Sequence, residues 1–247
     1  SVLIVAKTAP PPGAFSEISA AIAAATDGDV IVVRSGDYDP VDLNGRSLTI
    51  TADVGANVMV GTIWVRNIAA GQRVVLRSLH VYATYEFGSP HPKGTIGIEN
   101  SSGPVILEDV FAGGGVLFGA PFAAACHVES SSHVLLTRCE LLGYKEDFFI
   151  APALSSTSSS IAAYQCQITG GTGKSAVFSG FINDPGGPGS AGAVVNGGSL
   201  CAAGCVITGG AGGPGDTNGS ICLAAGSGGP GLIATNVASN IAAITRL

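Results

Sequence analysis

Charge is what this sequence has least of. Charged residues make up 11% of the 247 residues, whereas a typical soluble domain has about 25%. Hydrophobic residues make up 46%, and a disordered chain needs the opposite balance of low hydrophobicity with high net charge. With 11 Lys and Arg against 17 Asp and Glu, the formal net charge is −6. This balance argues against a nucleic-acid partner, because such proteins need a basic surface.

Long apolar runs are also missing. No stretch reaches the ~18 apolar residues that a bilayer-spanning helix needs, so we predict no membrane span. The apolar segment of a signal peptide is missing too, and we expect Ser1 to begin a mature or trimmed chain. Only one segment has helical spacing: it runs from Phe15 to Thr26, with Ser16 as the expected N-cap.

A nine-residue unit recurs along the rest of the chain, which is rich in glycine. Positions 2 and 4 of the unit are apolar in every copy, as expected for a strand with one buried face. A less regular copy occupies residues 47–55. The six regular copies cover residues 73–81, 104–112, 133–141, 160–168, 199–207 and 231–239.

The apolar period breaks in the second half of each unit. Position 7 is apolar instead of position 6, so we expect the chain to bend at positions 5 and 6. Ser, Asp, Gly and Asn at position 6 suit a sharp bend with left-handed backbone, whereas Arg138 and Gln165 suit it less well. Cys139, Cys166 and Cys205 share position 7 and should stack inside the protein as a ladder of mostly free thiols.

A further strand is expected before most units. Short Ser and Gly turns join this strand to the unit that follows, so each repeat consists of strand, turn, strand, bend and strand. The expected additional strands cover residues 95–99, 125–129, 148–152, 193–196 and 221–225. Stacked repeats of this kind form three parallel sheets, which is a parallel β-helix. We predict one domain, with a strand and capping helix at 1–28 and β-helix coils at 29–247.

The chain resembles right-handed parallel β-helix proteins of the pectin lyase-like superfamily. Residues 15–40 look like the capping helix and first strand of those proteins, and residues 46–55 look like their next coil. The superfamily includes lyases, hydrolases, esterases, epimerases, tailspikes and structural proteins. The resemblance therefore implies the fold and leaves the function open.

Two segments resemble the paired active-site segments of pectin methylesterases. They are CELLGYKEDFF at 139–149 and SIAAYQCQITGGTGKSAVFSG at 160–180. Lys145 stands where that family has Gln, and Glu146 stands where it has its first Asp. No carboxylate stands at Lys174 or Ser175, where the nucleophilic Asp of the family falls. No intact catalytic motif is therefore present.

Candidate site residues gather on the expected outer face of the first sheet, where the enzymes of the superfamily usually place catalysis. Glu99, His127, Glu129 and Asp147 are expected on this face, and His127 and Glu129 share it because they are two residues apart on one strand. Glu99, Glu129 and Asp147 can supply oxygen ligands for Ca²⁺.

Catalysis on a uronate substrate requires a base or a neutralising cation as well. Lys145, His127 and Glu129 are the predicted catalytic residues. The predicted substrate-binding residues are Glu99, Tyr144, Tyr85 and Lys93. Together with these residues, the superfamily resemblance implies an extracellular or cell-surface protein that binds or acts on an acidic polysaccharide such as pectin or alginate, through polysaccharide lyase-like or carbohydrate esterase-like chemistry if it is catalytic. The competing interpretation of the same face is ordinary surface polarity.

An apolar stripe favours a different function. Position 3 of the unit should face outward, yet it is apolar in all copies: Val75, Ile106, Leu135, Ala162, Cys201 and Ile233. Such a stripe requires cover, either from the long loops or from another chain. The alternative function is thus a non-catalytic structural or assembly module, either a homo-oligomer or part of a larger parent protein. The Gly-rich segments 184–192, 209–216 and 226–231 are expected to be turns between coils.

Overall fold

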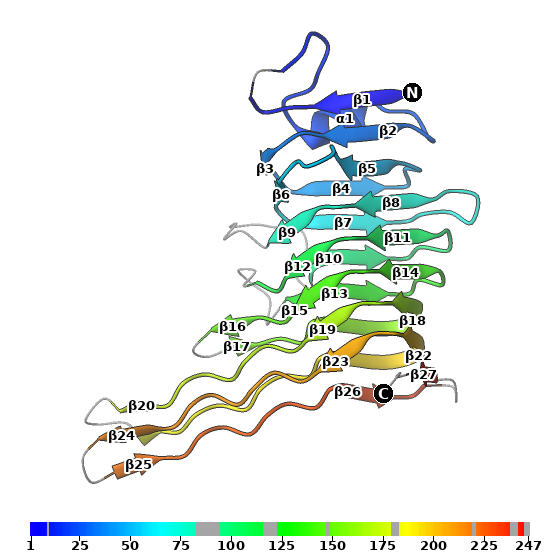
Figure 1. The fold of residues 1–247 in the computed structure, drawn as a ribbon. Coiled ribbons are helices and arrows are strands. Elements are labelled where there is room, and N and C mark those ends of the chain that lie inside the picture. Colours follow the sequence, from blue (N-terminus) through cyan, green and yellow to red (C-terminus); the bar gives the residue numbers. More distant parts are fainter. Residues whose placement is uncertain are drawn as a thin grey trace.

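The structure is a computed structural model that describes residues 1–8, 10–82, 94–115, 123–146, 149–178, 183–218, 221–237 and 242–244. Parallel strands stack coil upon coil into a rod, so the expected parallel β-helix is confirmed (Figure 1). No helix in these residues is long and apolar enough to cross a membrane.

Three parallel sheets form the sides of the rod, and the first two are joined because the long strands β18 and β22 pass from one to the other. The first sheet contains β4 (Val41–Asn44), β7 (Ile63–Arg66), β10 (Gly94–Glu99), β13 (Ala124–Glu129), the beginnings of β18 (Leu154–Tyr164) and β22 (Ala193–Ala203), and β26 (Leu232–Thr235). The second contains β1 (Val2–Val5), β2 (Val30–Val33), β5 (Thr49–Ala52), β8 (Val74–Arg77), β11 (Val105–Glu108), β14 (Val134–Thr137), the ends of β18 and β22, and β27 (Ala242–Ile244). The third contains β3 (Gly36–Tyr38), β6 (Val58–Val60), β9 (His80–Tyr82), β12 (Phe111–Gly113), β15 (Glu140–Leu142), β19 (Gln167–Thr169) and β23 (Val206–Thr208).

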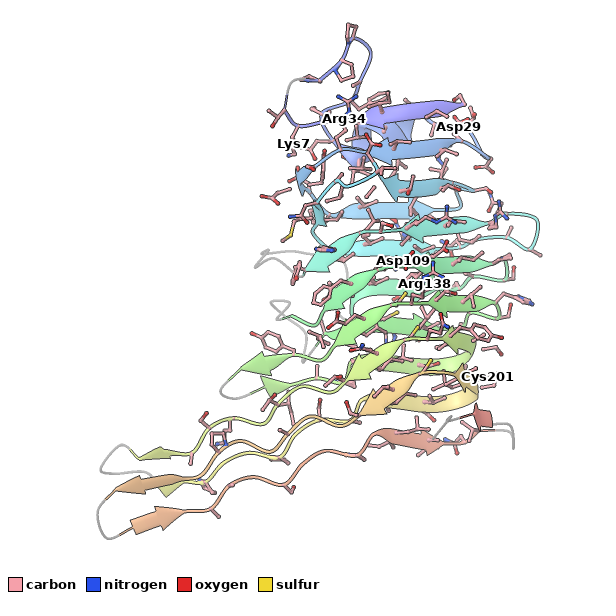
Figure 2. The ribbon with its side chains drawn as sticks, in the orientation of Figure 1. Lys7, Asp29, Arg34, Asp109, Arg138 and Cys201 are labelled. Atoms are coloured by element: carbon pink, nitrogen blue, oxygen red, sulfur yellow. The ribbon has the colours of Figure 1, made fainter. Side chains whose placement is uncertain are left out.

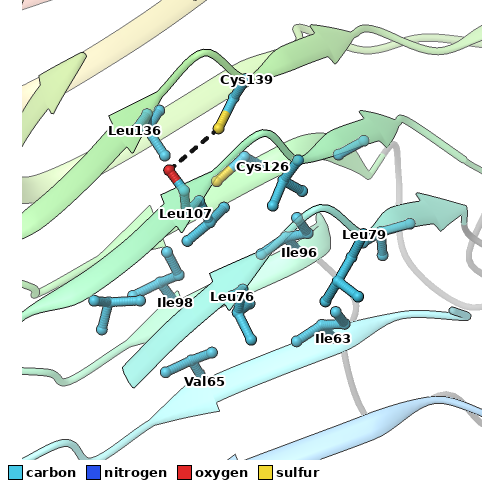
Figure 3. Close-up of a cluster of buried hydrophobic side chains, with 14 of the residues drawn as sticks. Ile63, Val65, Leu76, Leu79, Ile96, Ile98, Leu107, Cys126, Leu136 and Cys139 are labelled. Atoms are coloured by element: carbon cyan, nitrogen blue, oxygen red, sulfur yellow. Dashed lines mark hydrogen bonds between the residues drawn. The ribbon is translucent and has the colours of Figure 1, made fainter. Parts of the chain in front are cut away.

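The inward positions of the three sheets form one continuous apolar core. Ile63, Ile96 and Ile98 from the first sheet meet Leu76 and Leu107 from the second, and all five are almost completely buried (Figure 3). Leu76 and Leu107 are at position 4 of their units, which the repeat predicts to face inward. Burial of each such side chain contributes about 1.5–3 kcal/mol.

The expected bend at position 6 is confirmed, and it also occurs at Arg138 and Gln165, whose side chains do not favour left-handed backbone. Arg138 and Gln165 have φ of 52° and 54°, in the left-handed region, as do Ser78, Asp109 and Gly204. The stacking of identical coils imposes this backbone conformation whatever the side chain.

The bend between the first and second sheets contains a ladder of buried serines. The Ser131 hydroxyl accepts the backbone N–H of Ser101 at 3.2 Å, and the Ser159 hydroxyl accepts that of Ser131 at 3.1 Å. Each hydroxyl also donates to a carbonyl two residues earlier in its own coil. The ladder satisfies backbone donors that the turn would otherwise leave buried without a partner.

The N-terminal helix is shorter than predicted. α1 covers Ile18–Ala24, Glu17 precedes it as N-cap without a side-chain cap, and Ile18 packs into the end of the core. Ser16 is therefore not the cap. The reason is that the backbone of Phe15 is still extended and hydrogen-bonds to β1, with its N–H on the Ile4 carbonyl at 2.9 Å.

Two of the expected first-sheet strands are wrong. The strand expected at 148–152 begins at Leu154, and the one expected at 221–225 is β26 at Leu232–Thr235. β26 pairs with the beginning of β22, so Leu232–Thr235 belongs to the first sheet and does not form the second-sheet strand of a sixth copy of the unit. The corresponding second-sheet strand is β27, which pairs with Cys201–Ala203.

The Gly-rich segments form a projecting arm instead of simple turns. Four extended segments leave the rod side by side and end at the short hairpins β20 (Val177–Phe178) with β21 (Asn183–Asp184) and β24 (Asp216–Asn218) with β25 (Ile221–Leu223) (Figure 1). Gly170, Gly173 and Ala176 donate to the carbonyls of Thr208, Ala211 and Pro214, and Gly186, Gly189 and Gly192 donate to those of Ala224, Ser227 and Pro230. This three-residue period is that of the polyproline II helix, so the arm is a bundle of such helices.

Candidate functional site

The outer face of the first sheet carries two columns of side chains, because successive residues of a strand alternate in and out and neighbouring coils are in register. The first column is Asp42, Trp64, Gly97, His127, Ser155, Val194 and Ile233. The second column is Asn44, Arg66, Glu99, Glu129, Thr157, Asn196 and Thr235. The second column is therefore polar on every strand, whereas the first column is polar only at Asp42, His127 and Ser155.

The N-terminal end of this face is a compact cluster around Arg66. Its guanidinium makes two hydrogen bonds to Asp42, at 3.1 and 2.7 Å, and lies 3.8 Å from the Trp64 ring centroid. The hydrogen bond to Asp42 raises the pKa of Arg66. The indole lies over Gly97, where a Cβ would be only 3.2 Å from the Trp64 ring. Arg66 is thus neutralised locally and Trp64 is held against the sheet.

The centre of the face is formed by His127 on β13. The residue is only 7% exposed. Its Nδ1 lies 3.3 Å from the Ser155 hydroxyl, and its Nε2 lies 3.4 Å from the Glu129 carboxylate. Ser155 comes from the next coil and is half-buried. The imidazole therefore lies between a hydroxyl and a carboxylate and contacts both.

The predicted site residues are only partly brought together. Glu99 lies directly beside Glu129 in the register of β10 and β13, as predicted. Tyr144 lies at the corner that leads back to the first sheet, packed beside Gly114. Lys145 begins the short hairpin of β16 (Lys145–Glu146) and β17 (Phe149–Ile150), and its side chain is not described. Tyr85, Lys93 and Asp147 lie outside the described residues.

Four residues of this face escaped the sequence analysis. Asp42, Trp64 and Arg66 precede the first regular copy of the unit, and Ser155 lies beside His127 at the point where Asp147 was expected. The run of hydroxyl residues at 155–160 hides the strand period, so the start of β18 has no clear apolar alternation. The alternating VDLN and IWVR segments were a usable signal for the other three.

Calcium remains a prediction. Glu99 and Glu129 supply two neighbouring carboxylates, and the third predicted ligand, Asp147, is outside the described residues. Among the residues that are described, no group of three or more His, Cys, Asp or Glu could hold a metal ion. The described side chains alone therefore do not make up the six to eight oxygen ligands of calcium.

The second methylesterase-like segment lies away from this face. Lys174 and Ser175 belong to the Gly-rich arm, whereas β18 reaches the first sheet only at 154–157. Methylesterase chemistry therefore has no counterpart at those two positions.

The apolar stripe is present on the outer face of the second sheet. Ile106, Leu135, Ala162 and Cys201 line a shallow groove of about 520 Å³, with Tyr164 at its side. Val75 is largely buried and Cys201 is exposed. Ile233 is not part of the stripe, because β26 lies in the first sheet. Cover by a second chain or a larger parent protein remains a prediction.

The thiol ladder is confirmed within the core. Cys126, Cys139, Cys166, Cys201 and Cys205 are free. The Cys139 thiol donates to the Leu107 carbonyl at 3.4 Å (Figure 3). Burial raises the pKa of Cys126 to about 12, and a hydrogen bond to Cys139 together with burial raises that of Cys166. High pKa values keep Cys126 and Cys166 protonated and unreactive. The hydrogen bond with Cys166 lowers the pKa of Cys139, so that thiol is protected by its burial alone.

Comparison with known proteins supports the architecture. No protein-family model and no curated protein matches the chain. Among solved structures, a pectin methylesterase from Erwinia chrysanthemi is similar at 14% identity and a TM-score of 0.54, covering 82% of this chain and 64% of that one. A pectin methylesterase in complex with a hexasaccharide is similar at 13% identity and a TM-score of 0.51, covering 82% of this chain and 78% of that one. This chain thus spans about two thirds of the Erwinia enzyme, and it has the fold of these right-handed parallel β-helix proteins.

Proposed function

We propose that the chain is an extracellular protein that binds an acidic polysaccharide of the pectin or alginate type along the outer face of the first sheet. The observation that carries this proposal is the second column, whose side chains are polar on all seven strands, next to Asp42, His127 and Ser155 of the first column. A small ligand needs one pocket, whereas a row of donors and acceptors spaced about 4.8 Å apart suits a polymer.

The charges on this face favour a partly esterified polymer. Glu99 and Glu129 are adjacent carboxylates, and the Arg66 charge is already paired with Asp42. A free uronate next to the two glutamates would meet like charges, which disfavours binding unless a cation intervenes. Esterified uronates avoid that repulsion, and Ca²⁺ shared between Glu99, Glu129 and the polymer would remove it.

Native affinity electrophoresis tests the proposal. The chain is run in gels that contain highly esterified pectin, polygalacturonate, alginate or neutral dextran, each with Ca²⁺ and with a chelator. We expect retardation by highly esterified pectin in both conditions, by polygalacturonate and alginate only with Ca²⁺, and none by dextran. Glu129→Ala and Thr157→Ala should each weaken the apparent affinity for highly esterified pectin by about tenfold, the equivalent of one lost hydrogen bond to a charged or polar partner.

Gln167→Ala is the matched control, since Gln167 is an exposed residue of the third sheet. Equal mobility in every gel would overturn the proposal. If Glu129→Ala and Thr157→Ala are retarded as strongly as Gln167→Ala, the binding surface lies elsewhere, which would overturn the proposal as well.

A further inference from the structure

We infer that Ser155, His127 and Glu129 form a nucleophilic relay that hydrolyses carboxylic esters, with Ser155 as the catalytic nucleophile. This inference rests on the proposed function, because it assigns an ester of the same polysaccharide as substrate. Its basis is the contact of one imidazole with two partners: Nδ1 is 3.3 Å from the Ser155 Oγ, and Nε2 is 3.4 Å from Glu129 Oε2.

The order of the three groups is the one that serine nucleophiles require. A serine hydroxyl is a weak nucleophile and needs an adjacent base, and that base needs a third group to orient it. The Glu129 carboxylate can only accept, so Nε2 carries the ring proton and Nδ1 is the unprotonated nitrogen that accepts from Ser155. Distances at the long end of hydrogen bonding are common in such sites before substrate binds.

Register between coils holds the arrangement in place. His127 and Glu129 leave the same face of β13, and Ser155 is the in-register partner of His127 on β18. His127 is almost fully buried, whereas Ser155 is half-buried and reaches the surface. The base is thus shielded from water while the nucleophile remains accessible, which suits attack on a bound polymer.

The reaction balances without a cofactor. Ser155 Oγ forms a bond to the ester carbonyl carbon while His127 takes the hydroxyl proton. The bond between the carbonyl carbon and the alcohol oxygen then breaks, and His127 returns the proton to the departing alcohol. Water then attacks the acyl-enzyme and gives its proton to His127. The bond between the acyl carbon and Ser155 Oγ breaks, His127 passes that proton to Oγ, and the carboxylic acid is released.

The experiment measures chemistry and binding separately. The full chain is treated with a fluorophosphonate probe, and the labelled residue is identified by mass spectrometry. Methanol and acetate release from methylated and acetylated pectin, and hydrolysis of 4-nitrophenyl acetate, are then measured for wild type, Ser155→Ala, His127→Gln and Ser160→Ala. Ser160 is an exposed hydroxyl on the same strand, outside the first sheet, and serves as the matched control.

We expect the probe on Ser155, a loss of hydrolysis of at least 100-fold in Ser155→Ala and His127→Gln, and no change in Ser160→Ala. Thermal melting of the variants reports whether they are folded. Absence of label on Ser155, or full hydrolysis by folded Ser155→Ala, overturns the inference. If folded Ser155→Ala is inactive but is still retarded by pectin, the proposed function stands. If wild type is not retarded by pectin, the proposed function is refuted, while the labelling and the hydrolysis of 4-nitrophenyl acetate still test the relay.

Discussion

At the scale of single residues, the backbone of each coil overrides side-chain preference. Asp109, Arg138 and Gln165 occupy equivalent bends with φ of 53°, 52° and 54°. A left-handed conformation costs a residue with a Cβ roughly 1–2 kcal/mol. Asp109 and Arg138 gain an ion pair across coils, with the guanidinium 2.7 Å from the carboxylate, whereas Gln165 is exposed and has no such partner among the described residues (Figure 2).

Gln165→Gly should therefore stabilise the protein by about 1 kcal/mol, because glycine adopts left-handed backbone without steric cost. Urea unfolding measures the change in the free energy of unfolding. Gln167→Gly is the control, since that residue lies in the ordinary strand β19 and should lose about 0.5–1 kcal/mol. A loss of stability in both variants would contradict the explanation.

Residue burial also predicts which thiols react. Cys201 is exposed, whereas Cys126, Cys139 and Cys166 are buried. Brief treatment of the folded chain with iodoacetamide should modify Cys201 and leave the three buried thiols intact until the protein is unfolded, because reactivity needs an accessible thiolate. Peptide mapping by mass spectrometry measures the modification. Rapid labelling of Cys139 or Cys166 in the folded state would contradict the buried ladder.

At the scale of elements, the Gly-rich arm is the largest departure from expectation. The segments contain mainly Gly, Pro, Ala and Ser, which is a composition typical of turns and flexible linkers. Hydrogen bonds between segments distant in sequence give them order instead. Gly213 and Gly226 show why glycine is required, since a Cβ on either would overlap with a carbonyl oxygen of the neighbouring segment.

Gly213→Ala should lower the free energy of unfolding of the arm by about 1–3 kcal/mol, the usual cost of forcing an extra group into a packed position. Amide hydrogen exchange of residues 209–215 and 185–192 measures the local effect. Gly228→Ala is the matched control, because the nearest atom to its Cβ would be the Gly210 carbonyl oxygen at 3.7 Å. Equal exchange in both variants would show that the arm is not a packed bundle.

At the scale of the whole molecule, ion pairs connect successive coils on the outer surface. Glu108 accepts hydrogen bonds from two arginines, each at 2.7 Å. Arg77 belongs to the preceding coil and Arg138 to the following coil. These arginines, Arg138 foremost, lower the pKa of Glu108, and Arg138 lowers that of Asp109. In a chain so poor in charge, three arginines are thus used in ion pairs between coils.

Stability should therefore fall as the pH is lowered below about 4.5. A carboxyl whose pKa is lower in the folded state binds fewer protons there than in the unfolded chain, so its contribution is present above the unfolded pKa and lost as the pH falls through the folded pKa. Urea unfolding between pH 7 and pH 3 measures this slope. Glu108→Gln combined with Asp109→Asn should flatten it, and an unchanged slope would contradict the assignment. The effect is modest because the pairs are partly exposed.

The sequence by itself determined the coil. Alternation at positions 2 and 4 sets which side chains face inward, and the shift to position 7 sets the bend, because both depend on neighbours along the chain. The same local rules placed Glu99, His127 and Glu129 on one outer face.

Only the tertiary structure decided which residues of neighbouring coils contact one another. The loops between units vary in length, so register cannot be counted along the chain, and β26 joined the first sheet rather than completing a sixth unit. Ser155 lies beside His127, and the glycine segments pair into an arm, through hydrogen bonds between coils. Such contacts join residues far apart in sequence, and no local pattern specifies them.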